Sequence, residues 1–304
     1  MEHTLDTNGV VRLAHWGVIR ARGADAARFL HGQLTSDMLN LGTGRAVPAG
    51  FCSAKGRLQA SFIVWAGEAD EILLAGSASL LAPTLKRLSM FVMRAQCKLD
   101  DATAELPLHG LAGPAALALL GDAQPWECRR SAAGTAIRLP DAQGVPRAML
   151  AGTAPSGVTP LDADTWRWLE VSSGVPVIEA STVDQFVPQM VNFELVGGVN
   201  FKKGCYPGQE VVARSQYRGT LKRRGTLLRS PQPMAAGQEV YHSADPGQPA
   251  GTVALAAGPV DGAYLALTEL KLAALQGGSL HLGAADGATM TPAPLPYELP
   301  SDGP

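Results

Sequence analysis

Apolar residues in the first third of the chain follow a strand-and-helix order. A short apolar stretch occupies 10–13. Four apolar residues then recur at helical spacing and indicate a helix with one buried face: Ala26, Phe29, Leu30 and Leu34. The runs 58–65 and 71–76 flank a turn at 67–70, which predicts a β-hairpin. A second, amphipathic helix is predicted by Leu81, Leu85, Leu88 and Val92. This order is that of an α+β unit.

The middle third predicts a second unit of mixed elements. In chain order they are a helix at 114–121, strands near 135–139 and 147–152, and a helix at 163–174. Asp162 or Asp164 supplies the N-cap of the last helix, and Gly174 ends it. We therefore predict another α+β unit.

Short apolar runs separated by Gly, Pro, Asp or Ser begin after Arg224. They read TLLRS, QEVYH, GTVALAA, AYLALTEL and SLHLG, and they predict a small antiparallel barrel or sandwich. We place a boundary near Arg224 and divide the chain into three parts. These are a first α+β lobe at 1–110, a second α+β lobe at 111–224 and a β-rich part at 225–304.

Composition and charge exclude several classes of protein. The 304 residues are 46% hydrophobic with a formal net charge of -2, which gives no overall signal for binding nucleic acid or an anionic membrane. The four cysteines form no CxxC pair, so no disulfide framework or metal site is predicted. The glycine motifs of nucleotide-binding proteins are absent. No apolar run approaches the ~20 residues that span a bilayer, and the first residues lack a signal-peptide pattern. We expect a monomer in the reducing cytoplasm.

The segment FKKGCYPGQEVVARSQYRG at 201–219 contains the strongest candidate chemistry. Gly204 and Gly208 bracket Cys205 in a predicted turn, and a helix is predicted from Gln209. A helix N-terminus and adjacent lysines favour the thiolate form of a cysteine. Cys205 is therefore either a reactive thiol or a small residue in an ordinary turn, and the residues alone leave both interpretations open.

The same region is rich in basic residues, and Glu210 is its only acid up to position 224. The basic residues are Lys202, Lys203, Arg214, Arg218, Lys222, Arg223 and Arg224. Such a run is most often a solvated face, and its functional alternative is electrostatic binding of RNA.

Together with three earlier segments, KKGCYPGQEVVAR resembles the signature of the YgfZ family of folate-binding proteins linked to tRNA modification. The earlier segments are HGQLTSD at 31–37, FCSAKGR at 51–57 and WRWLEVSSGVPVIEA at 166–180. This family is related to the aminomethyltransferase (T-protein) of glycine cleavage. The resemblance implies two interlocked α+β lobes and a C-terminal antiparallel β-barrel, arranged around a central hole that binds tetrahydrofolate or another reduced folate.

The resemblance also implies which residues bind folate. Trp16 and Trp166 fall in segments associated with the folate site, and an indole can stack on a pterin ring. Buried tryptophans are, however, more often core residues.

A second group of implied site residues surrounds the cysteine. Cys205 is the implied functional thiol, and Lys203 shapes its environment. Gln209 and Glu210 begin the helix of the implied cofactor site. Arg214 either pairs with Glu210 across one helical turn or binds a folate carboxylate.

The function implied by the resemblance is support of iron–sulfur cluster assembly or repair in client enzymes, including enzymes that thiolate tRNA. The implied partners are iron–sulfur enzymes or cluster-assembly proteins, with a transient cluster contact at the thiol. The link to tRNA is expected to be weak or indirect, and no membrane partner is expected. Whether Cys52 approaches Cys205 is left open.

One departure from the family's relatives bears on mechanism. The aminomethyltransferases carry an aspartate in a segment that matches 55–61, where this chain has Gln59 and Ala60. The electrostatic and proton-handling role of that carboxylate therefore has no obvious holder. Two alternative functions are a folate-dependent one-carbon transferase, which needs such a group, and a non-enzymatic tRNA-binding module that uses the basic run ending at Arg224.

Overall fold

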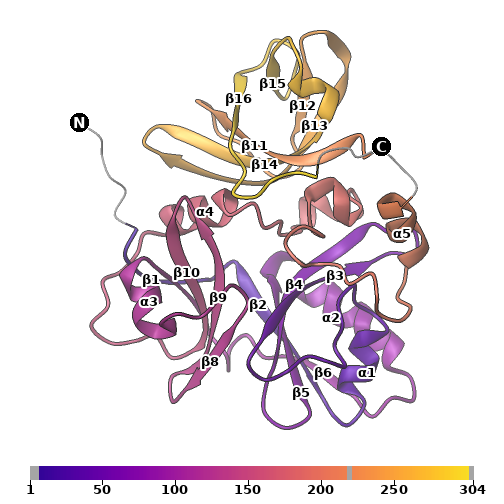
Figure 1. Ribbon diagram of the computed structural model, residues 1–304, viewed down its shortest axis with the longest axis vertical. Coiled ribbons are helices and arrows are strands. Elements are labelled where there is room, and N and C mark those ends of the chain that lie inside the picture. Colours follow the sequence, from indigo (N-terminus) through magenta and orange to yellow (C-terminus); the bar gives the residue numbers. More distant parts are fainter. Residues whose placement is uncertain (1–6, 218–220, 301–304) are drawn as a thin grey trace.

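Two antiparallel sheets and a closed barrel make up the protein (Figure 1). They are seen in a computed structural model that describes residues 7–217 and 221–300. In the view of Figure 1 the two sheets lie side by side, with the barrel above them. This arrangement confirms the predicted α+β fold with a C-terminal β-barrel. No helix among the described residues is long and apolar enough to cross a membrane.

The first sheet has the strand order β3-β4-β5-β2-β6, with antiparallel neighbours throughout. Its strands are β2 (Trp16–Arg22), β3 (Ala46–Cys52), β4 (Leu58–Ala66), β5 (Glu71–Ser77) and β6 (Lys98–Asp101). The pairing of β4 with β5 confirms the predicted hairpin. The amphipathic helix is confirmed by α2 (Ala78–Val92), which buries Leu81 and Leu88.

The first predicted helix is shorter than its apolar pattern indicates. The helix α1 spans Ala26–His31, so Leu34 is buried but lies beyond the helix end, where it bridges to Phe51. The ammonium of Lys203 donates to the carbonyl oxygens of His31 and Leu34. The His31 carbonyl at the helix end and the Leu34 carbonyl three residues later are therefore bonded to a distant side chain rather than to a further helical turn.

The second sheet has the strand order β1-β7-β10-β9-β8. Its strands are β1 (Gly9–Arg12), β7 (Leu108–Ala112), β8 (Cys128–Ser131), β9 (Gly134–Ala142) and β10 (Val145–Gly152), and its helices are α3 (Pro114–Leu120) and α4 (Ala163–Ser172). The chain thus places β1 in the second sheet before it builds the first. Asp162 caps α4 by accepting a hydrogen bond from the Thr165 amide at 2.9 Å, as predicted.

The barrel closes because its first strand, β11, pairs with both β14 and its last strand, β16. Its strands are β11 (Arg223–Ser230), β12 (Glu239–His242), β13 (Asp245–Val260), β14 (Ala263–Lys271), β15 (Leu280–Leu282) and β16 (Thr289–Ala293), with the short helix η3 (Leu272–Leu275) after β14. The helix α4 lies between the second sheet and the barrel (Figure 1). The barrel therefore rests on the lobes and does not stand apart from them.

The segment between α4 and the barrel connects all three parts. It contains the short helices η1 (Ala180–Thr182) and η2 (Pro188–Val191) and the helix α5 (Gln209–Tyr217). Asn192 holds the start of the barrel, because its side-chain amide donates to the Gly225 carbonyl at 2.8 Å and accepts from the Gly225 amide at 3.1 Å. Arg224 and Glu194 form a buried ion pair next to this contact.

Candidate functional site

The loop that carries Cys205, residues 201–208 and here termed the Cys205 loop, lies against the turn between β3 and β4. A side chain at Gly208 would meet the Ser53 carbonyl oxygen at 2.4 Å and Gly56 at 2.6 Å. Gly208 also has a φ of +79°, so both the backbone conformation and the space require glycine. The helix α5 begins at the next residue, which confirms the predicted turn and helix.

Lys203 points into the protein. Its Nζ donates to the carbonyl oxygens of His31 and Leu34, the latter at 2.7 Å, and lies 4.9 Å from the ring centroid of Tyr206. Cations bond favourably to the unpaired carbonyls at a helix end and to an aromatic face. Lys203 therefore fixes the Cys205 loop to the segment that follows α1.

The thiols of Cys205 and Cys52 differ in character. Cys205 is exposed and forms no disulfide, whereas Cys52 is buried. Burial, with a smaller contribution from the charge of Asp184, raises the pKa of Cys52 to about 12. Burial also lowers the pKa of Lys203 to about 8, and the charges of Asp37 and Cys205 oppose that change. Of these two thiols, only Cys205 is open to a reagent and next to a cation.

The helix residues predicted to bind a cofactor lie beside this loop. Gln209 is half-buried, whereas Glu210 and Arg214 are exposed. No ion pair joins Glu210 to Arg214 in the part of the chain that the structure describes, so the Arg214 guanidinium is not engaged by that carboxylate. The structure thus brings Cys205, Lys203 and the start of α5 together.

Trp16 and Trp166 lie elsewhere, in the hydrophobic core formed by the second sheet and its neighbours. Both are buried, with 5% and 1% of their surface exposed. The Trp16 Nε1 donates to Glu170 Oε1 at 2.8 Å, and the Arg147 guanidinium lies 5.6 Å from a Trp166 ring centroid. Trp16 therefore contacts a buried carboxylate, and Trp166 contacts a buried guanidinium.

Glu170 on α4 is a candidate functional residue that the sequence reasoning missed. Besides the Trp16 bond, its Oε2 lies 2.8 Å from His15 Nε2 and 3.0 Å from an Arg167 nitrogen. Burial acts to raise the pKa of Glu170, but His15 and Arg167 outweigh it and hold the pKa at about 2. The sequence does contain a signal for it, because Glu170 is a single acid between the apolar residues Leu169 and Val171, and both of these are buried.

Two neighbouring cavities lie beside this group. The small cavity, about 20 Å³, is lined in part by Trp16, Arg147 and Glu170. The large cavity, about 940 Å³, shares three lining residues with it: Trp126, Pro140 and Ser173. The wall of the large cavity includes Tyr297, which follows the barrel and donates from its hydroxyl to the Gly174 carbonyl at 2.7 Å. An ionised carboxylate and an indole thus line a small cavity that shares part of its wall with a ligand-sized one.

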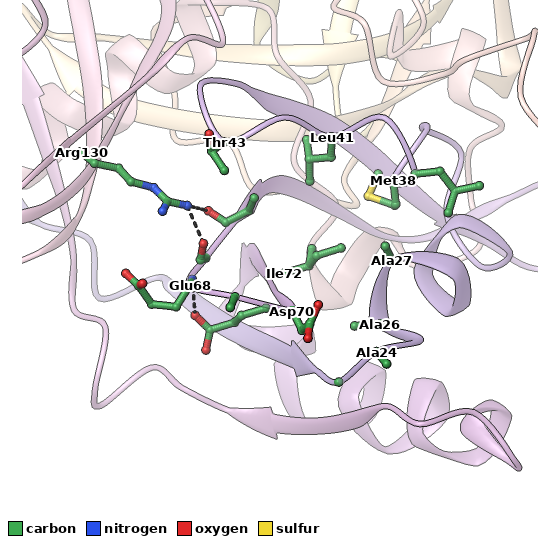
Figure 2. A pocket seen from close by; sticks show the side chains of 16 residues that line it. Ala24, Ala26, Ala27, Met38, Leu41, Thr43, Glu68, Asp70, Ile72 and Arg130 are labelled. Atoms are coloured by element: carbon green, nitrogen blue, oxygen red, sulfur yellow. Dashed lines mark hydrogen bonds between the residues drawn. The ribbon is translucent and has the colours of Figure 1, made fainter.

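Figure 2 shows a further cavity, about 340 Å³, beside the β4–β5 hairpin. Arg130 of β8 crosses to it and donates to the carbonyl oxygens of Ala66 at 2.6 Å and Gly67 at 2.5 Å. Glu68 and Asp70 are part of its wall, and none of the predicted site residues lines it. Its acidic wall is unsuited to an anionic ligand.

A carboxylate lies beside Gln59, although the segment 55–61 itself contains no acid. The side-chain amide of Gln59 donates to Asp184 Oδ2 at 3.1 Å, and Asp184 comes from the segment after η1. A carboxylate from a distant part of the chain therefore lies next to Gln59, in the segment that lacks the aspartate. Among the described residues, no group of three or more His, Cys, Asp or Glu is arranged to hold a metal ion.

The basic run is partly neutralised by folding. Arg223 pairs with Glu269 at 2.8 Å, and Arg224 pairs with the buried Glu194. Lys203 is internal, and Arg218 lies outside the described residues. The remaining basic residues of the run are exposed: Lys202, Arg214 and Lys222. The positive surface is therefore smaller than the count of basic residues indicates.

Comparisons with known proteins agree with this architecture. No model of a protein family matches the chain. The tRNA-modifying protein YgfZ of Edwardsiella ictaluri is 31% identical over 95% of this chain and 92% of its own length. The protein of the same name from Sodalis glossinidius is 29% identical over 95% of this chain and 93% of its own length. The aminomethyltransferase T structure of the Bartonella henselae glycine cleavage system matches with a TM-score of 0.73 and 17% identity, over 95% of this chain and 85% of that one. This structural similarity, at low sequence identity, shows that the two chains share a fold.

We predict that Lys203→Met lowers the free energy of unfolding by about 1.5–3 kcal/mol, because the carbonyls of His31 and Leu34 lose a charged donor. The measurement is urea denaturation followed by circular dichroism. Lys202→Met is the matched control, since Lys202 is exposed, and its effect should stay within about 0.5 kcal/mol. Equal losses in the two variants would contradict a structural role specific to Lys203.

Proposed function

Because the chain belongs to the YgfZ family of tRNA-modifying proteins, we propose that it supports tRNA modification through a bound reduced folate and the Cys205 thiol. Its task is the assembly or repair of iron–sulfur clusters in client enzymes, including enzymes that thiolate tRNA. The observation that carries this proposal is the exposed thiol on a loop that Lys203 and Gly208 hold in one position.

The large cavity has room for a folate. Its volume of about 940 Å³ suits small-molecule sites, which are typically about 300–1,000 Å³, and the small cavity beside it, about 20 Å³, is lined by Glu170 and Trp16. Glu170 is buried and ionised, so it can accept hydrogen bonds from the paired N–H groups of a pterin ring. Trp16 offers an indole to the same ring, and Tyr297 bounds the opposite part of the space. Tetrahydrofolate, when bound, supplies a carrier of one-carbon units.

The Cys205 loop is suited to transient contact with a macromolecular client. Iron–sulfur clusters are bound by cysteine thiolates, and a nearby ammonium stabilises a thiolate. The exposed position of Cys205 lets a client's cluster, the substrate of the reaction, reach the sulfur without opening the core. Lys203 positions the loop and supplies the positive charge.

One observation favours the one-carbon transferase as a second candidate. The Asp184 carboxylate contacts Gln59, beside the position of the transferase aspartate, and can take part in proton handling. The RNA-binding module is less well supported, because Arg223 and Arg224 are engaged in ion pairs.

We predict that Glu170→Gln weakens tetrahydrofolate binding about tenfold or more, because the pterin loses a charged acceptor. The measurement is calorimetric titration, with the melting temperature recorded for each variant. Leu195→Trp, which fills the large cavity away from Glu170, should also weaken binding. Glu68→Gln, in the cavity of Figure 2, is the matched control and should bind as wild type. Loss of binding in Glu68→Gln alone would assign folate to the other cavity.

We predict that Cys205→Ser abolishes complementation of tRNA thiomethylation in a strain that lacks the gene, because the sulfur is removed. Its melting temperature should stay near that of wild type, since the side chain is exposed. Cys97→Ser, at a half-buried thiol, is the control and should complement. Full tRNA thiomethylation in a strain that carries Cys205→Ser would contradict the proposal that Cys205 is the functional thiol.

We expect no turnover when the purified protein is given methylenetetrahydrofolate and amine acceptors, with released product followed by mass spectrometry. Turnover that Asp184→Asn reduces about a hundredfold or more would support the transferase instead, because that is the usual size of an acid–base contribution.

A further inference from the structure

His31 lies against the backbone that carries Cys205. A side chain built on Gly204 would meet His31 Nε2 at 3.3 Å and Cδ2 at 3.9 Å, and it would meet no other part of the described protein within 4 Å. Gly204 directly precedes Cys205. Because Lys203, on the other side of Gly204, bonds to the His31 carbonyl, the loop is also held to the backbone of His31.

Asp37 orients the His31 ring. The two side chains meet through His31 Nδ1 and Asp37 Oδ1 at 3.1 Å. Asp37 also accepts from the Asn40 side-chain amide at 2.7 Å and from the Leu39 backbone amide at 3.0 Å. These bonds, chiefly that of Asn40, outweigh burial and lower the pKa of Asp37, so its carboxylate is ionised at neutral pH. In a neutral His31 ring, an ionised acceptor at Nδ1 favours the tautomer with the proton on Nδ1, in which Nε2 carries the lone pair.

We propose that His31 is the proton acceptor of Cys205 and that Asp37 is its positioning residue. Because the Cys205 thiol makes no direct hydrogen bond to the ring in the part of the chain that is described, its proton passes to His31 Nε2 through one water. The S–H bond breaks, and a thiolate and an imidazolium result. No oxidant or reductant is needed. The inference rests on the proposed function in one respect, namely that Cys205 is the functional thiol.

The surrounding charges favour this ion pair. Asp37, from the segment after α1, contacts the imidazole, and the charge of Lys203, from the Cys205 loop, interacts electrostatically with Cys205. Lys203 itself is poorly placed to accept the proton, because its Nζ already donates to two carbonyls and lies over the Tyr206 ring. A base and a group that orients it, both from the segment at the end of α1, thus lie beside the backbone that carries the nucleophile.

The test is the rate at which iodoacetamide alkylates Cys205 in the folded protein between pH 5 and 10, located by peptide mass spectrometry. His31→Gln should slow alkylation at pH 7 about tenfold and shift the rate profile to higher pH, because the proton acceptor is lost. Asp37→Asn should shift the profile in the same direction by a smaller amount. His281→Gln, at a barrel histidine, is the matched control and should react as wild type.

Gly204→Ala gives a second test that changes no titratable group. Its methyl group would lie 3.3 Å from His31 Nε2, so it should separate the imidazole from the loop and slow alkylation as well. Melting temperatures identify any variant that fails to fold, and the folded variants then decide the question. Alkylation profiles that coincide with wild type in the folded variants would overturn the proposal. The assay needs no folate, client or tRNA, so its outcome is independent of whether Cys205→Ser affects thiomethylation.

Discussion

The Cys205 site depends on the hydrogen bonds that the Lys203 ammonium donates to the His31 carbonyl, at the end of α1, and to the Leu34 carbonyl just beyond it. These bonds satisfy two backbone acceptors with a buried cation and join the second-lobe segment to the first lobe. Two neighbouring contacts extend the junction, because the Thr35 hydroxyl donates to the Gly198 carbonyl and the Asn200 amide donates to the Thr35 carbonyl. Cys205 is exposed, but the backbone on which it stands is fixed.

The candidate folate cavity and the Cys205 loop lie on different cores of the same molecule. Trp16 and Trp166 pack in the core of the second sheet, whereas Val212 of α5 packs in the core of the first. The chain that follows α4 connects them, and Asn192 and Glu194 attach that chain to the barrel. A ligand in the large cavity would therefore touch the same segment that continues into the thiol loop, which gives the two regions a shared mechanical support.

Local pattern predicted the elements well because a helix or hairpin is specified by neighbouring residues, as the Asp162 cap and the β4–β5 pair show. It did not predict contacts between distant segments. Lys202 and Lys203 look identical in sequence, yet one is exposed and one is buried. Glu170 lies more than 150 residues along the chain from its partners Trp16 and His15, so no spacing rule could associate it with them. Counting charges likewise could not show that Arg224 is paired within the core.

The position of Tyr297 has a consequence for the order of synthesis. Its hydroxyl bonds to Gly174, and its ring forms part of the wall of the large cavity, although it belongs to the segment that leaves the barrel. The cavity wall is therefore incomplete until residue 297 has left the ribosome. A ligand that needs this wall binds only chains that include Tyr297, and its binding energy then adds to the stability of those chains alone. Chains truncated before residue 297 gain no such stabilisation, so the ligand itself distinguishes chains that carry this segment from chains that lack it.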